Sequence, residues 1–303
     1  MTTIFDLASL AKVVATVTAV MILNDRGLLD LNGSVAEIIP EFSGGGRESV
    51  TVLHLLTHTS GLPSHRRVWK YAASPQRAMT RVLATSLQGE IGRCEVYSDL
   101  GFIILGEIVQ RVSGLRLDVF STAKSFDRLG MFDTCFLPSQ DLVARCASTE
   151  DDPWRGRVLT GEVHDENAYA LGGVSGHAGL FSTAGDLARF GQMILRGGEL
   201  EGCRVLSESA VATVIANQTA HLATARGLGW VRRPNPFFGS AVAAGPNAIS
   251  HTGFTGTSIY IDPDVDVCAV LLTNAVHPVR DGAAQKTLRA KFHAAVNAAV
   301  QPG

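Results

Sequence analysis

Residues 4–23 read IFDLASLAKVVATVTAVMIL, with one hydroxyl and one amine at the front of a long apolar run. Ser9 and Lys12 are three residues apart, so a helix would place their side chains on the same face. The run Val13–Leu23 carries no charge, and Gly27 follows Asn24-Asp25-Arg26 as a helix stop. We therefore predict a buried helix over residues 9–26, with Ser9 in its first turn.

The composition describes an ordered globular protein without a strong net charge. The 303 residues are 46% hydrophobic and 18% charged, which is enough apolar material for a large core in one domain or two packed lobes. Lys and Arg number 26 and Asp and Glu 28, for a net charge of −2. No stretch has the basic character that binds nucleic acid or anionic lipid. The five cysteines are scattered and form no Cys-x-x-Cys pair, which argues against a disulfide framework and a zinc site and favours a reducing compartment.

The apolar run near the front is not predicted to be a membrane span. Val13–Leu23 is too short to cross a bilayer. A secretory signal begins with basic residues, whereas Asp6 is the only charge before Lys12. Without a span or a signal peptide, the chain as given is expected in the cytoplasm, and an additional segment before Met1 would leave the location open.

The middle of the chain has a helical pattern. Residues 31–160 are predicted as helices joined by loops, with one apolar helix ending near Gly61 and another running over residues 99–114. A further helix should follow Thr183, because its spacing from Asp186 is that of a capping box.

The last third of the chain changes to strands. Short β-branched or aromatic runs, LGWVRR, AISHTG, TSIYID and VCAVLLTN, are separated by turn residues, and Asp262-Pro263-Asp264 predicts a hairpin between the last two. The chain should close on a helix over residues 281–300, with Leu288, Phe292, Val296 and Val300 on one face. We predict an α+β fold with a mostly helical lobe over residues 1–165, an antiparallel sheet flanked by helices over residues 166–303, and an active site between the lobes.

Ser9 and Lys12 have the spacing of a nucleophile motif. The first turn of a helix offers free backbone N–H groups and the positive end of the helix dipole, which favour negative charge. Apolar surroundings lower the pKa of a lysine, so a neighbouring hydroxyl could pass it a proton. S-x-x-K occurs with a K-T-G strand in β-lactamases and penicillin-binding proteins, but the tetrapeptide also arises by chance. Taken alone, the tetrapeptide is better explained by Ser9 as a helix cap and Lys12 reaching solvent.

Two further motifs follow in the order that this signature requires. YSDLGF places Tyr97 before a helix, and SHTGFTGTS places His251, Thr252 and Gly253 on a predicted strand. With ASLAK they resemble the three motifs of the serine β-lactamase and penicillin-binding protein superfamily. The resemblance is to the branch of class C β-lactamases, D-Ala-D-Ala carboxypeptidases, D-aminopeptidases and β-lactamase-like carboxylesterases. LLTHTSGLP, GLFSTAGDLARF and GLGW extend it over nearly the whole chain, and it implies a β-lactamase/transpeptidase-like fold without a cofactor.

The resemblance also implies a role for each matching residue. Ser9 would be the nucleophile that forms an acyl-enzyme, and Lys12 and Tyr97 would share the work of the general base. The backbone N–H groups of Ser9 and Phe254 would form the oxyanion hole. Gly253 would let the substrate lie close along the strand. The substrate-binding residues would be Asp99, His251, Thr252 and Gly253.

Two residues depart from the family pattern. Asp99 stands where the family usually has asparagine, and a carboxylate should hold Lys12 in its charged form and repel an anionic substrate. Either Asp99 or Ser98 is also suited to cap the following helix. His251 replaces the commoner lysine and would titrate near neutrality, with a half-buried structural histidine as the alternative. We expect small esters or amides to be better substrates than penicillins.

The front of the chain is shorter than in the family. Relatives have a helix and two or more sheet strands before the serine, whereas eight residues precede Ser9 here. With these N-terminal strands missing, a sheet edge and the closing helix would be exposed. We expect either that the start is misassigned or that a partner chain, such as a second copy in a homo-oligomer, covers this edge. A naturally reduced protein is the alternative.

Two weaker candidate sites are better explained by structure than by function. His54 and His58 form H-x-x-x-H, but a zinc protease needs glutamate after the first histidine and this chain has Leu55. Residues 161–179 gather acidic and histidine side chains beside glycines, which favours loop-ordering hydrogen bonds over substrate contact. These side chains belong to Glu162, His164, Asp165, Glu166 and His177.

The sequence predicts a serine hydrolase that acts on a small ester, amide or peptide through an acyl intermediate on Ser9. No metal, cofactor or nucleic-acid partner is expected. The alternative is a catalytically impaired, penicillin-binding-like protein that binds a ligand without turning it over, which Asp99 and the shortened front favour. The motifs do not choose between esterase, peptidase and β-lactamase, because pocket shape decides the substrate.

Overall fold

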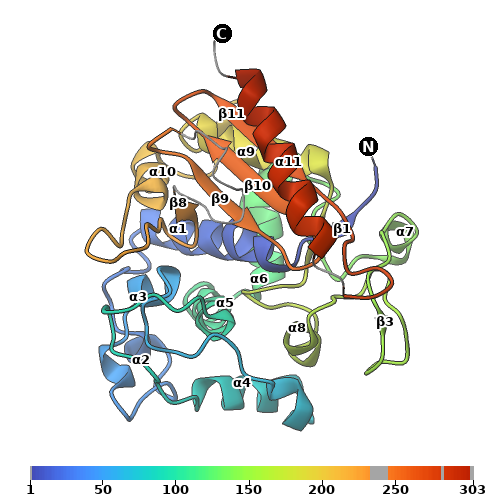
Figure 1. Cartoon of the computed structure of the whole chain (residues 1–303). Coiled ribbons are helices and arrows are strands. Elements are labelled where there is room, and N and C mark those ends of the chain that lie inside the picture. The colour runs from blue at the N-terminus through green and yellow to red at the C-terminus, as the bar shows by residue number, and fades with distance from the viewer. Residues whose placement is uncertain (1, 233–244, 281–282, 301–303) are drawn as a thin grey trace.

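The fold is α+β, built around a four-stranded antiparallel sheet (Figure 1). The computed structural model describes residues 2–232, 245–280 and 283–300. The sheet has the order β11-β10-β9-β8. Its strands are β8 (Val231–Arg232), β9 (Ile249–Thr252), β10 (Ser258–Asp262) and β11 (Val267–Leu271). Helix α11 (Ala283–Val300) crosses one face of the sheet, and α9 (Ala184–Leu195) packs on the other face (Figure 1).

The predicted hairpin is confirmed. Strands β10 and β11 pair from Ser258 opposite Leu271 to Asp262 opposite Val267, so the Asp262-Pro263-Asp264 turn joins them. The outer side of β11 has no partner strand within the described residues, and whether a partner chain covers it stays a prediction. The prediction for Leu288 is wrong, because its side chain is 48% exposed. Phe292 and Val296 of the same predicted face do pack against the sheet.

The predicted front helix is also confirmed, with mixed internal hydrogen bonding. A 3-10 turn (Ala8–Leu10) leads through a π-helical stretch (Lys12–Val17) into α1 (Thr18–Asp25). The helix is long and apolar enough to cross a membrane by length and composition alone, but 83% of it is buried inside the fold. It forms part of the main apolar core, which continues into α5 (Asp99–Ser113) and into strands β9 and β10.

Most of the remaining helices come from the first half of the chain. Several of them, with α8, lie below the sheet in Figure 1. Helix α3 ends before the predicted stop near Gly61, and His58 adopts a left-handed conformation with φ 59 just after it. The helices are α2 (Val35–Ile38), α3 (Val52–Leu56), α4 (Pro75–Leu83), α5 (Asp99–Ser113), α6 (Leu117–Ser121), α7 (Gln140–Val143), α8 (Glu166–Ala170) and α10 (Glu208–Ile215). Short 3-10 or π turns are Arg47–Ser49, Val68–Tyr71, Thr122–Phe126 and Asp127–Leu129.

Short strands anchor the segment that precedes Ser9. Strand β1 (Phe5–Asp6) pairs with β5 (Leu180–Ser182), which pairs on its other side with β2 (Cys135–Phe136). The other two-residue strands pair as β3 (Asp151–Asp152) with β4 (Arg157–Val158) and β6 (Glu199–Leu200) with β7 (Cys203–Arg204). The division into lobes at residue 165 stays a prediction.

Candidate active site

Ser9 follows β1 closely and lies in the first turn of the front helix. Between them, Ala8 adopts a left-handed conformation with φ 47, which costs about 1–3 kcal/mol in a residue with a side chain. The Asp6 carboxylate holds this turn, because its Oδ1 accepts the Ala8 N–H at 2.8 Å. The Ser9 N–H belongs to the first helical turn, where a backbone donor has no carbonyl partner within the helix.

Lys12 is completely buried, and oxygen atoms surround its ammonium nitrogen. Nζ lies 2.7 Å from Asp99 Oδ1 and donates to Ser9 Oγ and to the His177 carbonyl, both at 3.1 Å. The centroid of the Tyr97 ring is 4.9 Å from the same nitrogen. Side chains of the first two motifs therefore meet at one atom.

The pairing with Asp99 decides the charge of Lys12. Burial acts to lower the pKa of Lys12, but the Asp99 carboxylate and the Tyr97 phenol outweigh it and raise the pKa to about 12. Burial likewise acts to raise the pKa of Asp99, and the Lys12 ammonium overrides it and holds that pKa well below its usual range. The lowered pKa expected for Lys12 from its apolar neighbours is wrong, whereas the prediction that the Asp99 carboxylate holds Lys12 in its charged form is confirmed.

Ser98, rather than Asp99, caps helix α5. Ser98 Oγ accepts the Gly101 N–H at 3.3 Å, which leaves the Asp99 carboxylate to pair with Lys12. The second carboxylate oxygen lies 3.7 Å from Nδ1 of the exposed His65, and this contact raises the pKa of His65. One carboxylate thus faces a buried cation on one side and a histidine on the other.

The loop that carries Tyr97 is held from both sides. Arg226 pairs with Glu95, with Nη2 at 2.5 Å and Nε at 2.7 Å from Oε1. The His58 ring packs 4.6 Å from the Tyr97 ring, and its Nδ1 accepts the Ser98 N–H at 3.0 Å. Burial, then the charges of Arg226 and Lys12, hold the pKa of His58 well below its usual value. A neutral histidine therefore buttresses Tyr97.

Strand β9 brings His251 and Thr252 to the same place. His251 is buried, with its ring centroid 6.0 Å from that of Tyr97. Burial, then the charges of Lys12 and Arg226, hold the pKa of His251 well below 6.5. The expectation that His251 titrates near neutrality is wrong, because tertiary packing removes the solvent that this titration needs.

Gly253 is required by the contact between β9 and the chain that precedes Ser9. A Cβ at this position would lie 2.4 Å from the Leu7 carbonyl oxygen and 2.1 Å from Thr257 Oγ1. The Gly253 N–H donates to the Thr257 carbonyl at 2.8 Å, and the Thr257 hydroxyl donates to the Leu7 carbonyl at 3.0 Å. Glycine is therefore needed here for packing against the chain before Ser9, in addition to the predicted role of leaving space for the substrate.

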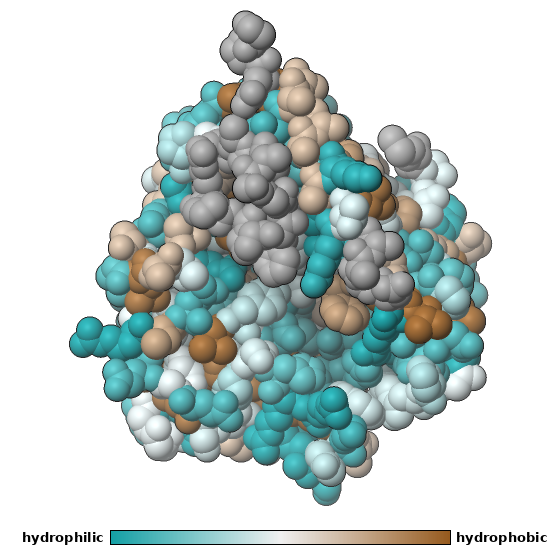
Figure 2. Space-filling view, viewed as in Figure 1, coloured by the Kyte–Doolittle hydropathy of each residue, from teal (hydrophilic) through white to brown (hydrophobic). Residues whose placement is uncertain are grey.

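These side chains meet at one cleft of about 470 Å³. Figure 2 shows this face hollowed between the upper part of the molecule and the helices below, with mostly hydrophilic side chains in the hollow. The Phe254 ring is 59% exposed at the cleft, and its N–H has no hydrogen-bond partner within the described residues. The lining includes Ser9, Tyr97, His251, Thr252, Gly253 and Phe254, and Lys12 and Asp99 lie behind Ser9.

The cleft is lined by cations. Arg226, Arg280, Lys286 and Arg289 all contribute to it, and no carboxylate of the described residues does. Arg226 Nη1 and Arg289 Nε are buried without a hydrogen-bond partner in the part of the chain that the structure describes. Arg289 Nη2 donates to the carbonyls of Gly253 and Thr257, both at 3.2 Å. Sequence patterns gave no signal for these residues, because their positions depend on the tertiary fold.

The weaker candidates have structural contacts. His54 Nδ1 accepts the Thr51 N–H at 3.1 Å in a capping box. His177 lies between Ser175 Oγ and Asp165 Oδ1, at 2.8 and 2.9 Å. Glu162 pairs with Arg155 and Arg157, Glu166 with Arg280, and His164 with Glu150. Within the described residues no group of three His, Cys, Asp or Glu side chains is arranged to hold a metal, and the five cysteines are free.

Comparisons with known proteins agree on one family and one fold. The family model described as Beta-lactamase matches residues 1–294. N-acetylmuramyl-L-alanine amidase of Bacillus subtilis (strain 168) is 33% identical over 311 residues, which cover 92% of this chain and 70% of that protein. A novel penicillin-binding protein homolog from Caulobacter crescentus superposes with a TM-score of 0.74 at 21% identity, over 97% of this chain and 84% of that one. Simvastatin synthase (LovD) from Aspergillus terreus gives a TM-score of 0.75 at 22% identity, over 99% and 85% of the two chains. At these identities the two structures show a likeness of fold.

Proposed function

The chain belongs to the Beta-lactamase family, and we propose on this basis that it is a serine hydrolase that forms an acyl intermediate on Ser9. Its substrates would be small esters, amides or D-amino-acid peptides. The observation that carries the proposal is the 3.1 Å contact between Lys12 Nζ and Ser9 Oγ, at a cleft that Tyr97 and the end of β9 also line.

The charge of Lys12 favours Tyr97 as the group that would accept the Ser9 proton. An ammonium cannot accept the Ser9 proton, so the general-base role shared in the sequence prediction would fall to Tyr97 alone, acting as its phenolate. The Tyr97 ring lies 4.9 Å from Lys12 Nζ and 5.8 Å from the Arg226 guanidinium. Tyr97 would take the proton as Ser9 Oγ attacks the carbonyl carbon, and would return it to the leaving alcohol or amine.

Charge on the substrate oxygen would be stabilised by two backbone donors. The N–H groups of Ser9 and Phe254 would bind the oxyanion, and donors fixed by the fold need no reorganisation as charge develops. Water would then hydrolyse the acyl ester on Ser9 with Tyr97 again as the base. His251, neutral at neutral pH, would contribute a hydrogen bond rather than a charge.

The cations of the cleft favour a substrate with a carboxylate near the scissile bond. Lys12 neutralises the charge of Asp99, so the repulsion expected from Asp99 alone is offset. Arg226, which also pairs with Glu95, is one of the four cations that line the cleft and could meet an anionic group. The Bacillus subtilis relative is named an amidase, which supports amides among the substrates. That penicillins are poorer substrates than small esters stays a prediction.

Labelling with a fluorophosphonate tests the proposal. The wild type should be labelled and should hydrolyse at least one member of a panel of esters, D-amino-acid amides and penicillins. Ser9→Ala should lose both properties, and the exposed Ser43, changed to alanine, is the matched control that should keep them. Intact labelling of Ser9→Ala would overturn the proposal. Binding of panel members by the wild type without turnover would support the ligand-binding alternative instead.

A further inference from the structure

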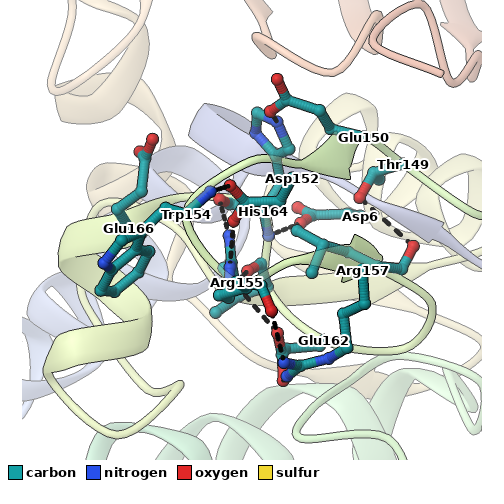
Figure 3. A network of polar contacts seen from close by, with 12 residues as sticks. Asp6, Thr149, Glu150, Asp152, Trp154, Arg155, Arg157, Glu162, His164 and Glu166 are labelled. Atoms are coloured by element: carbon teal, nitrogen blue, oxygen red, sulfur yellow. Dashed lines mark hydrogen bonds and ion pairs between the residues drawn. The ribbon is translucent and has the colours of Figure 1, made fainter. Parts of the chain in front are cut away.

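Asp6 is a buried carboxylate just before the turn that carries Ser9. Its side chain bonds only to backbone N–H groups within the described residues: Oδ1 accepts from Ala8 at 2.8 Å and Oδ2 accepts from His164 at 2.7 Å (Figure 3). It is 2% exposed, and burial raises its pKa, which the two N–H bonds offset in part. Burying a carboxylate without a cation costs free energy. The presence of Asp6 at this position therefore needs an explanation, which its contacts can supply.

The main chain at Asp6 is tied to the opposite side of the cleft. The Asp6 carbonyl accepts a hydrogen bond from Thr255 Oγ1 at 2.6 Å. Thr255 follows Phe254 directly and is itself buried. Asp6 therefore contacts the neighbour of Ser9 through its side chain and the neighbour of Phe254 through its carbonyl.

The Phe254 ring is held by residues of the same network. The His164 ring stacks on it, with centroids 5.8 Å apart and planes inclined by 22°. Glu150 Oε2 lies 2.9 Å from His164 Nε2 and accepts from Arg280 Nε at 2.6 Å, and the Arg280 guanidinium lies 5.8 Å from the Phe254 ring centroid. Figure 3 shows Glu150 above the His164 ring and Asp6 beside the His164 backbone. His164 thus links the Asp6 carboxylate to Phe254.

We propose that Asp6 is a positioning residue that fixes the separation of the two oxyanion donors, the N–H groups of Ser9 and Phe254. The inference rests on the proposed function, because it requires these donors to bind a developing oxyanion. Such donors act when they are held about 2.7–3.1 Å from the oxygen. Asp6 Oδ1 holds the left-handed turn that aims the Ser9 N–H, while the bond from Thr255 holds the loop that carries the Phe254 N–H.

Comparing an ester with its thionoester tests this role. Sulfur is larger than oxygen and a weaker hydrogen-bond acceptor, so an oxyanion site of fixed spacing discriminates against the thionoester. The ratio of kcat/KM for a phenyl ester to that for its thionoester measures the discrimination. Asp6→Asn keeps the size of the side chain but turns an amide donor toward a backbone N–H, and should lower the ratio about tenfold, less than the loss of a whole donor. Thr255→Val should lower it as well, and Thr255→Ser, which keeps the hydroxyl, should restore it.

A second carboxylate provides the matched control. Asp186 accepts the Asp133 N–H at 2.9 Å outside the cleft, and burial raises its pKa too. Asp186→Asn should leave the ratio unchanged, because destabilisation alone lowers the turnover of both esters equally. Thermal unfolding and near-ultraviolet circular dichroism identify the folded variants, and the Thr255 pair decides the question if Asp6→Asn does not fold.

The outcomes separate this role from the proposed function. If folded Asp6→Asn and Thr255→Val both keep the wild-type ratio of ester to thionoester kcat/KM, and turnover still depends on Ser9, the positioning role is wrong and the proposed function stands. Absence of Ser9-dependent turnover of the ester by the wild type would overturn the proposed function and this role with it.

Discussion

Replacing Asp99 with asparagine should destabilise the folded protein by about 3 kcal/mol at neutral pH. Lys12 is completely buried and its pKa of about 12 lies above the ordinary 10.5, so the fold favours the ammonium by about 2 kcal/mol at 1.36 kcal/mol per pKa unit. Asparagine removes this stabilisation and leaves the ammonium with Ser9 Oγ and the His177 carbonyl as acceptors. Losing one partner of a buried ion pair costs about 3–5 kcal/mol, and the low end applies because the Asp99 side chain is 20% exposed.

The loss of stability caused by Asp99→Asn should become smaller as the pH rises. In the wild type the folded pKa of Lys12 lies above the unfolded value, so its contribution to stability is fully present below pH 10.5 and is lost as the pH approaches about 12. In Asp99→Asn, burial is the largest influence on Lys12 and Asp99 no longer offsets it, so the folded pKa should fall below the unfolded one. The folded variant then releases the proton first and gains stability relative to the unfolded chain as the pH rises.

Urea unfolding followed by tryptophan fluorescence, at several pH values between about 7 and 10, measures both effects. The difference in the free energy of unfolding between the wild type and Asp99→Asn should narrow over this range. Lys12→Met combined with Asp99→Asn is the matched control, because it removes both charges and should show no such narrowing. Equal stability of Asp99→Asn and the wild type at pH 7, or a difference that stays constant to pH 10, would refute the assignment of a charged Lys12 held by Asp99.

Three further predictions concern β9 and the cleft. His251→Gln should keep the shape of the wild-type pH–rate profile between about pH 5.5 and 8, because burial and neighbouring cations hold the pKa of His251 well below 6.5. If the wild-type rate changes with pH in this range and the change disappears in the variant, the prediction is wrong. Gly253→Ala should lower the melting temperature and reduce kcat/KM roughly a hundredfold, since its Cβ would lie 2.4 Å from the Leu7 carbonyl oxygen. A wild-type melting temperature and kcat/KM would show that the strand accommodates the added methyl group. Lys286→Gln should reduce the preference for a carboxylate-bearing ester over its neutral methyl ester a few-fold at low salt and less at high salt, and an unchanged preference would remove Lys286 from substrate selection.

The sequence predicts those parts of the fold that local patterns determine. The helix that starts at Ser9 and the hairpin at Asp262-Pro263-Asp264 follow from apolar runs and turn residues that are adjacent in the chain. Leu288 is misplaced because a residue spacing of four identifies a helix face but does not say how much of that face the sheet covers.

The residues of the candidate site are harder to interpret from sequence than to find. The motifs identify Lys12 and His251, and the aspartate at position 99 already predicts that Lys12 is charged. The charge state of His251 could not be predicted, because burial, which only the fold determines, lowers its pKa. Asp6 is visible in the sequence as the only charge before Lys12. Its bonds to Ala8 and His164 need tertiary structure, so no spacing rule reveals them.

This chain has aspartate at position 99, where the family pattern has asparagine, and the difference changes the charge of Lys12. A neutral amide there would leave the buried Lys12 free to lose its proton, because burial would then be opposed only by the Tyr97 phenol. The carboxylate instead fixes Lys12 as a permanent cation and forms a pair with it that is neutral overall. Arg226, which pairs with Glu95, lines the cleft, and the Tyr97 ring lies 4.9 Å from Lys12 Nζ and 5.8 Å from the Arg226 guanidinium. Aspartate at position 99 therefore opposes a role for the Lys12 amine as a base without adding net charge to the site.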